Sequence, residues 1–99
     1  MKNKKVKAIL AEHLSNYQTE LIEVIDENTL PEHRQNFYAV AKALGCVRSE
    51  LLKETSAPAS FLKDLKEEVD ALLNQSFLPT CIRGLEQASY ALKELLDEY

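Results

Sequence analysis

Hydrophobic residues recur at alternating spacings of three and four along almost the whole chain. This spacing places them on one side of an α-helix, because a helix has 3.6 residues per turn. Four such stripes can be followed, separated by short segments that contain Pro, Ser, Thr or Asn. The pattern predicts four amphipathic helices, over about residues 4–26, 30–54, 58–75 and 79–98.

The residues of these stripes form the predicted core, which therefore draws on all four helices. The connections between helices are only a few residues long, so consecutive helices must run antiparallel. We expect an all-α fold, a single antiparallel up-down-up-down four-helix bundle, with residues 1–99 as one domain. The predicted core positions are Leu10, Leu14, Tyr17, Leu21, Val24, Phe37, Val40, Leu44, Val47, Leu51, Leu62, Leu65, Val69, Leu72, Leu78, Cys81, Leu85, Ala88, Leu92, Leu95 and Tyr99.

The second helix raises two local questions, one at its start and one in its middle. Thr29 and Glu32 have the spacing of a capping box, with Pro31 tolerated in the first turn. The core stripe keeps its phase through Gly45, which predicts one continuous helix to about residue 54. The alternative is a break at Gly45, with the glycine as a left-handed cap before a short helix that begins at Val47.

Charge and composition exclude several classes of function. The net charge is −4, with 16 acidic and 12 basic residues, whereas binding to nucleic acid needs clustered bases that neighbouring acids do not offset. The one basic cluster, which consists of Lys2, Lys4, Lys5 and Lys7, is typical of a solvated terminus. No apolar run approaches the roughly 20 residues of a membrane span. We therefore expect neither nucleic acid nor a membrane span.

The charged termini and the cysteines add two smaller expectations. In an up-down bundle the basic start of the first helix lies at the same pole as the acidic end of the fourth, which contains Asp97 and Glu98. The two clusters should then attract one another. Cys46 and Cys81 follow no disulfide or metal-binding pattern, which favours a reducing cytoplasm as the location.

The two histidines lack the spacing that metal-binding bundles use. Di-iron bundles place Glu three residues before His. Leu10 holds that place before His13, and Leu30 holds it before His33. A zinc site needs several Cys or His residues at local spacings, which the chain does not contain. We expect no metal and no cofactor.

Candidate catalytic residues are equally sparse. Cys81 falls on a core stripe, where a thiol behaves as a small apolar group. Histidine phosphotransfer domains carry Lys and Gly three and four residues after the acceptor, but His13 is followed there by Asn16 and Tyr17, and His33 lacks both residues too. We therefore expect a protein that is not an enzyme, with histidine phosphotransfer as the alternative function.

The second helix carries a further stripe beside its core stripe, which consists of Tyr38, Ala41, Gly45, Arg48 and Leu52. Small residues allow close approach of another backbone, and Tyr and Arg often anchor protein partners. The alternative is an ordinary bundle helix with a wide buried face. The stripe predicts a partner-binding surface for another protein or a second copy of the chain. It suggests an adaptor, chaperone, inhibitor or immunity-type regulator, or else a structural homodimer that associates through this helix.

Overall fold

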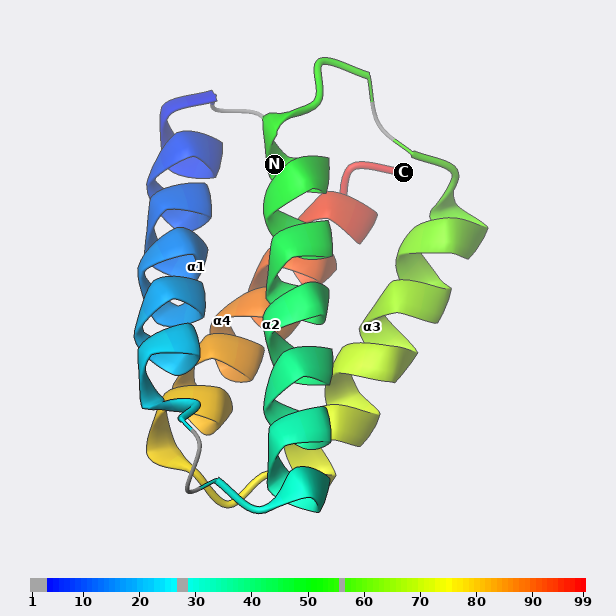
Figure 1. The fold of residues 1–99 in the computed structure, drawn as a ribbon. Helices are drawn as coiled ribbons and strands as arrows, with labels where there is room; N and C mark the ends of the chain where they lie inside the picture. Colours follow the sequence, from blue (N-terminus) through cyan, green and yellow to red (C-terminus); the bar gives the residue numbers. More distant parts are fainter. Residues whose placement is uncertain (1–3, 27–28, 56) are drawn as a thin grey trace.

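A computed structural model describes residues 4–26, 29–55 and 57–99, and it shows a bundle of four helices (Figure 1). Each helix runs antiparallel to the one before it, and the molecule measures 43 × 24 × 18 Å. The predicted all-α up-down-up-down bundle is confirmed. The helices are α1 (Lys4–Val24), α2 (Pro31–Leu52), α3 (Ala59–Gln75) and α4 (Pro79–Leu96).

The four helices do not contact one another equally. The most extensive packing joins α1 to α2 and α3 to α4, while α1 and α2 each pack on α4 as well. Helices α2 and α3 touch least, and Figure 1 shows α3 diverging from α2 toward the α3 N-terminus. The two closest seams of the bundle are therefore those between α1 and α2 and between α3 and α4.

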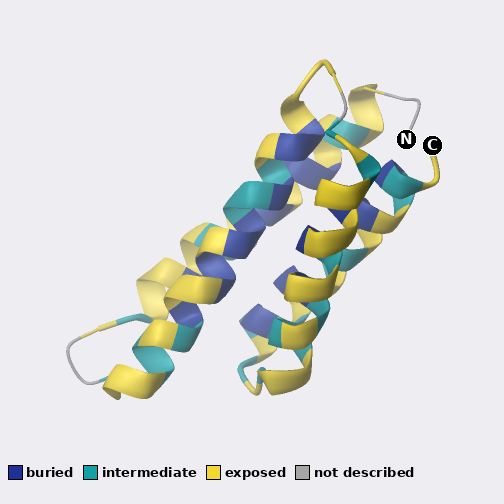
Figure 2. Ribbon diagram, turned by 90° about the vertical axis from the view of Figure 1, so that its right-hand side faces the viewer, coloured by how far each residue is buried: buried dark blue, intermediate teal, exposed yellow. Residues whose placement is uncertain are grey.

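The core lies along the axis of the bundle, where the buried faces of all four helices meet (Figure 2). Most predicted core positions are buried, while Tyr17, Leu72 and Leu78 are half-buried. The prediction is wrong for Val24 and Tyr99, which are 43% and 62% exposed. Both lie at helix ends: α1 stops at Val24, and Tyr99 follows the last turn of α4.

The start of α2 differs from the predicted capping box, whereas its middle agrees with prediction. The residue before the helix is Leu30, which makes no side-chain cap bond, and Pro31 is the first helical residue. The Thr29 hydroxyl instead accepts a bond from the Asp26 amide (3.1 Å) and donates to Asp26 Oδ1 (3.3 Å). Thr29 thus stabilises the loop rather than the helix. Helix α2 runs without a break through Gly45, so the continuous helix is confirmed.

The charged ends of the chain meet as predicted. Lys7 Nζ in α1 lies 3.7 Å from a carboxylate oxygen of Glu98, just after α4. The pair confirms that the basic and acidic ends share one pole of the bundle. Lys2, the first member of the basic cluster, lies outside the described residues.

A polar contact joins α3 to α4 around Asp70. The Ser89 hydroxyl donates to Asp70 Oδ1, and Lys66 Nζ donates to Asp70 Oδ2, both at 2.8 Å. Burial alone would raise the pKa of Asp70, but the hydrogen bonds from Lys66 and Ser89 and the charge of Lys66 outweigh it, so the pKa lies below its ordinary value of 3.8. The ionised form of Asp70 is therefore favoured by folding.

Replacement of Asp70 by Asn is expected to reduce the fall in the free energy of unfolding that the native chain shows as the pH is lowered into the acid range. An acid whose pKa is lower in the folded state than in the unfolded state stabilises the fold at any pH above its unfolded-state pKa. This stabilisation is lost as the pH falls through the folded-state pKa. The group is partly exposed, so the loss at neutral pH should be below about 1 kcal/mol. Urea unfolding at neutral pH and below pH 3.8 measures the difference. Asp64, an exposed acid on the same helix, is the matched control, and an equal change in Asp64→Asn would contradict the assignment.

Candidate binding surface

The predicted partner-binding stripe of α2 lies along the seam with α1, and the structure divides it into two kinds of residue. Tyr38 and Leu52, at its two ends, are each 54% exposed. Ala41 is buried at 5%, while Gly45 and Arg48 are half-buried. The ends of the stripe are therefore open to a partner, and its middle is turned toward the rest of the bundle.

The small residues in the middle of the stripe allow the close approach of α1 from the same chain. Gln18 of α1 donates a hydrogen bond from Nε2 to the Ala41 carbonyl at 2.9 Å. A β-carbon added at Gly45 would lie 2.9 Å from the same nitrogen, so a glycine leaves the Gln18 amide room to cross the seam. For Ala41 and Gly45, the stripe thus reflects a wide buried face of α2.

A hollow of about 410 Å³ opens at the Tyr38 end of the seam, lined by Ile25, Asp26, Arg34 and Tyr38. Arg34 Nη2 donates to the carbonyls of Asp26 and Thr29, both at 3.1 Å. These bonds tie the backbone at Asp26 and at Thr29 to the first turn of α2. The hollow is open to solvent and has an aromatic edge, with a guanidinium and a carboxylate beside it.

Ile22 adds apolar surface at the same end of the seam. It is 50% exposed and stands one helical turn from Gln18, on the side of α1 that faces α2. Periodicity within α1 alone gave no reason to assign Ile22 to a binding surface. Its place becomes visible only when α1 and α2 are paired in register.

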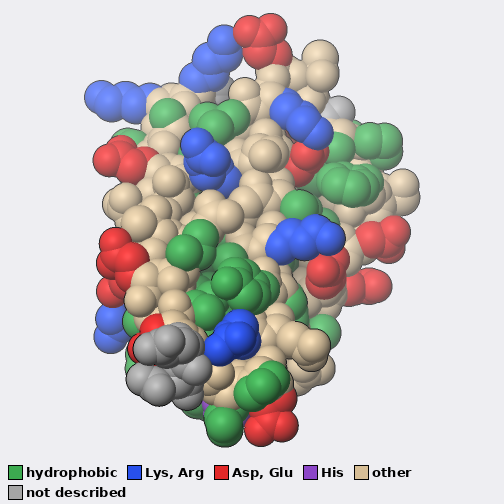
Figure 3. Space-filling model, viewed as in Figure 1, with side chains coloured by type: hydrophobic (Ala, Val, Ile, Leu, Met, Phe, Trp, Pro, Cys, Tyr) green, Lys and Arg blue, Asp and Glu red, His purple; other side chains and the backbone are tan. Residues whose placement is uncertain are grey.

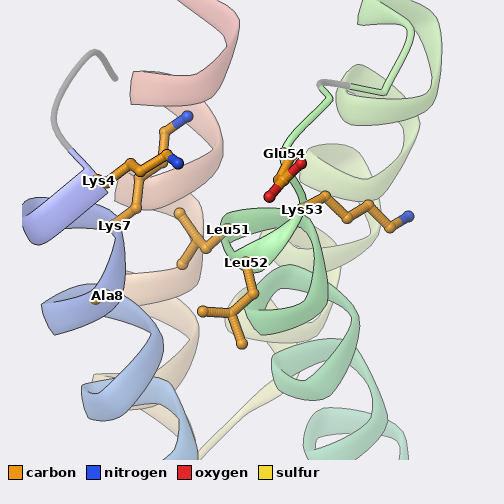
Figure 4. A pocket seen from close by; sticks show the side chains of 7 residues that line it. All are labelled: Lys4, Lys7, Ala8, Leu51, Leu52, Lys53 and Glu54. Atoms are coloured by element: carbon orange, nitrogen blue, oxygen red, sulfur yellow. The ribbon is translucent and has the colours of Figure 1, made fainter.

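A second hollow, of about 230 Å³, lies at the Leu52 end of the seam between the start of α1 and the end of α2 (Figure 4). In this view Leu51 and Leu52 project from α2 toward α1, and Lys4 and Lys7 extend from the facing turn of α1. Lys53 points away from α1 and binds Glu50 at 2.5 Å. The full lining is Lys4, Lys7, Ala8, Leu51, Leu52, Lys53 and Glu54.

The open parts of the seam lie along one side of the molecule, and we call them together the α1–α2 face. Figure 3 shows hydrophobic side chains gathered over α1 and α2, with Lys and Arg side chains around them and acids along the outer edge of α1. Residues 33–49 of α2 contain no acid. Within the described ranges, Lys42 and Arg48 have no hydrogen-bond or ion-pair partner. The α1–α2 face consists of Ile22, Asp26, Arg34, Tyr38, Lys42, Arg48, Leu52 and Glu54.

The two histidines lie apart from this face and from each other. The His33 ring packs against Phe77 and Phe37, with ring centroids 5.0 and 6.2 Å apart, at the end of the bundle where α2 begins. His13 is exposed on α1 beside a shallow hollow that Glu20 also lines. In the described part of the chain, no three His, Cys, Asp or Glu residues are grouped as a metal site would require.

The cysteines are both free thiols with little access to solvent. Cys81 is fully buried, and burial raises its pKa to about 11. Because the thiolate is the nucleophilic form, Cys81 stays protonated and inert at neutral pH. Cys46 is half-buried against the core.

Compared with models of known protein families, with curated protein sequences and with solved structures, the chain shows no match. None of the helices, as far as the chain is described, has the length and apolar character needed to cross a membrane. The α1–α2 face is therefore the feature from which a function can be inferred.

Proposed function

We propose that this chain is a small binding protein that acts by holding another protein against its α1–α2 face, with no catalysis of its own. The observation that carries the proposal is the pair of hollows at the two ends of one seam. Each hollow is edged by a large apolar side chain of α2, Tyr38 at one end and Leu52 at the other. An adaptor, chaperone, inhibitor or immunity-type regulator in the cytoplasm would use such a face in the same way.

The residue types on this face support binding of a protein. Tyr and Arg are enriched among the residues that dominate binding energy, and such anchors act best when they enter pockets. Tyr38 and Arg34 line one hollow, and Leu51 and Leu52 line the other hollow. Cations at the margin provide a polar rim. The face therefore combines apolar anchors with charges that can orient a partner.

A second copy of the chain fits this face less well than a different protein does. A two-fold symmetric dimer places the same patch on both sides of the interface. Lys42 and Arg48 would then face basic residues of the other copy, and like charges at an interface are unfavourable. The charge distribution thus favours a heterologous partner.

Affinity capture from the source cell with a Tyr38→Ala variant tests the proposed face. We expect recovery of the partner to fall about tenfold, because truncation of an aromatic anchor typically costs 1 to 2 kcal/mol or more. Tyr90→Ala is the matched control, since Tyr90 is 53% exposed on α4 and lies outside the α1–α2 face. Equal recovery with both variants would show that the face is not used.

Sedimentation of the native chain and of Leu52→Asp tests self-association: a dimer that the substitution dissociates would identify a second copy as the partner.

A further inference from the structure

We infer that the element bound by the α1–α2 face is an acidic amphipathic helix that lies along the seam. This inference rests on the proposed function and names the chemistry of the partner. Two independent observations carry it, the shape of the face and the charge along it.

The shape of the face suits a helix. Tyr38 and Leu52 are fourteen residues apart on a continuous helix, which places them about 21 Å from one another. Between them along the seam, Ala41 carries only a methyl group, Gly45 has no side chain and the Gln18 amide bonds to the Ala41 carbonyl, so these three residues leave no bulky side chain in the way. An amphipathic helix of about four turns spans this length and can bury its apolar stripe at both ends. An all-helical bundle offers no sheet edge that an extended strand could join.

The charge of the middle of the face favours an acidic helix. Lys42 is exposed and Arg48 is half-buried, and neither has a partner among the described residues. They lie between the two apolar anchors on residues 33–49, which contain no acid, although the whole chain has a net charge of −4. The acids of the two hollows, Asp26 and Glu54, lie beyond this stretch, at the ends of the seam. Acidic residues on both sides of the apolar stripe of such a helix would pair with Lys42 and Arg48, and few other charged groups would lose contact with water. A basic helix would meet two uncompensated charges.

An anionic membrane surface fits the same face less well. A bilayer would approach the whole broad side of the molecule, including the acids along the outer edge of α1 (Figure 3). The repulsion between those acids and the lipid headgroups would oppose the attraction of Lys42 and Arg48. A narrow helix can lie on the seam without covering that edge.

Two synthetic amphipathic helical peptides with the same apolar stripe test the inference, one flanked by Glu and the other by Lys. Binding is followed by fluorescence anisotropy, and the site is located by chemical-shift changes in the isotope-labelled native chain. We expect the acidic peptide to bind and to shift residues of α1 and α2 around Tyr38 and Leu52. Its affinity should fall about tenfold or more between low and high salt, because the charges are near the surface. The basic peptide should not bind.

Charge reversal at Lys42 and Arg48 provides the matched comparison. The double variant Lys42→Glu, Arg48→Glu should weaken the acidic peptide at least about tenfold and allow the basic peptide to bind. Lys63→Glu, Lys93→Glu reverses two exposed lysines on α3 and α4 and should leave both affinities unchanged. Circular dichroism confirms that both variants keep the native helix content.

The outcomes separate this inference from the proposed function. Equal binding of both peptides, no binding of the acidic peptide, or binding of anionic vesicles in its place overturns the inference. If the cellular partner is lost with Tyr38→Ala but kept with Lys42→Glu, Arg48→Glu, the face binds a protein but not an acidic helix. If the partner is kept with both variants, the proposed function itself fails.

Discussion

Replacement of Gly84 by Val is expected to lower the free energy of unfolding by about 3 kcal/mol. Gly84 lies in α4 where this helix meets both α1 and α2. A β-carbon there would lie 2.9 Å from Leu44 Cδ1 and 3.3 Å from Tyr17 Cβ. The Leu44 methyl group can rotate, but the Tyr17 β-carbon is fixed to its backbone. The added side chain must therefore push α4 away from α1, which urea unfolding would measure.

The contacts of Gly84 also predict how a second substitution behaves. Leu44→Ala alone should cost about 3 kcal/mol, since Leu44 is fully buried. Combined with Gly84→Val, it removes one side of the steric conflict, so the double variant should lose less than the sum of the two single losses. Strict additivity would show that the two residues do not share the space between α4 and α2.

Gly45 provides the contrast, because the atom nearest to its added β-carbon is the end of a flexible side chain. Gln18 Nε2 can move away at the cost of its bond to Ala41, worth about 1 kcal/mol. Alanine gains about 1 kcal/mol of helix propensity over glycine. Gly45→Ala should therefore be nearly neutral. A loss as large as that of Gly84→Val would mean that α1 and α2 are packed as tightly at Gly45 as α4 is at Gly84.

The architecture could be predicted from the sequence because the signals that determine it are local. Hydrophobic periodicity defines each helix, and short connections require antiparallel neighbours. Each observed helix begins and ends within two residues of its prediction. Where local signals compete, prediction failed: the Thr29 hydroxyl can cap α2 or bond to Asp26, and the loop geometry selects the second.

The candidate surface could be predicted only in part, because periodicity relates residues to the axis of their own helix. It placed Tyr38, Ala41 and Gly45 on one side of the second helix, but it could not say that α1 covers the last two. Ile22 and the two hollows depend on how α1 and α2 are aligned, which no pattern within a single helix contains. The net charge of −4 likewise gave no sign that residues 33–49 of α2 contain basic residues and no acid.

Replacement of Glu50 by Met is expected to raise the free energy of unfolding by about 2 kcal/mol. The Glu50 side chain is only 5% exposed, and its Oε2 accepts a bond from Lys53, whose side chain is 55% exposed. Its Oε1 is buried and has no hydrogen-bond partner among the residues that the structure describes. Removing a carboxylate from water costs several kcal/mol, and one bond to a half-exposed lysine offsets only part of that cost. Met fills a similar volume without the desolvation penalty.

Lys53→Ala removes the same ion pair and should act in the opposite direction. It leaves the Glu50 carboxylate buried with neither oxygen paired to any described residue, so we expect the free energy of unfolding to fall by about 1 to 2 kcal/mol. Urea unfolding of the native chain and of both variants at neutral pH measures the two changes. If both substitutions destabilise the chain, the ion pair stabilises it more than the burial of Glu50 costs. If Glu50→Met raises the free energy of unfolding and Lys53→Ala lowers it, the bundle carries a buried acid that makes it less stable than an apolar residue would.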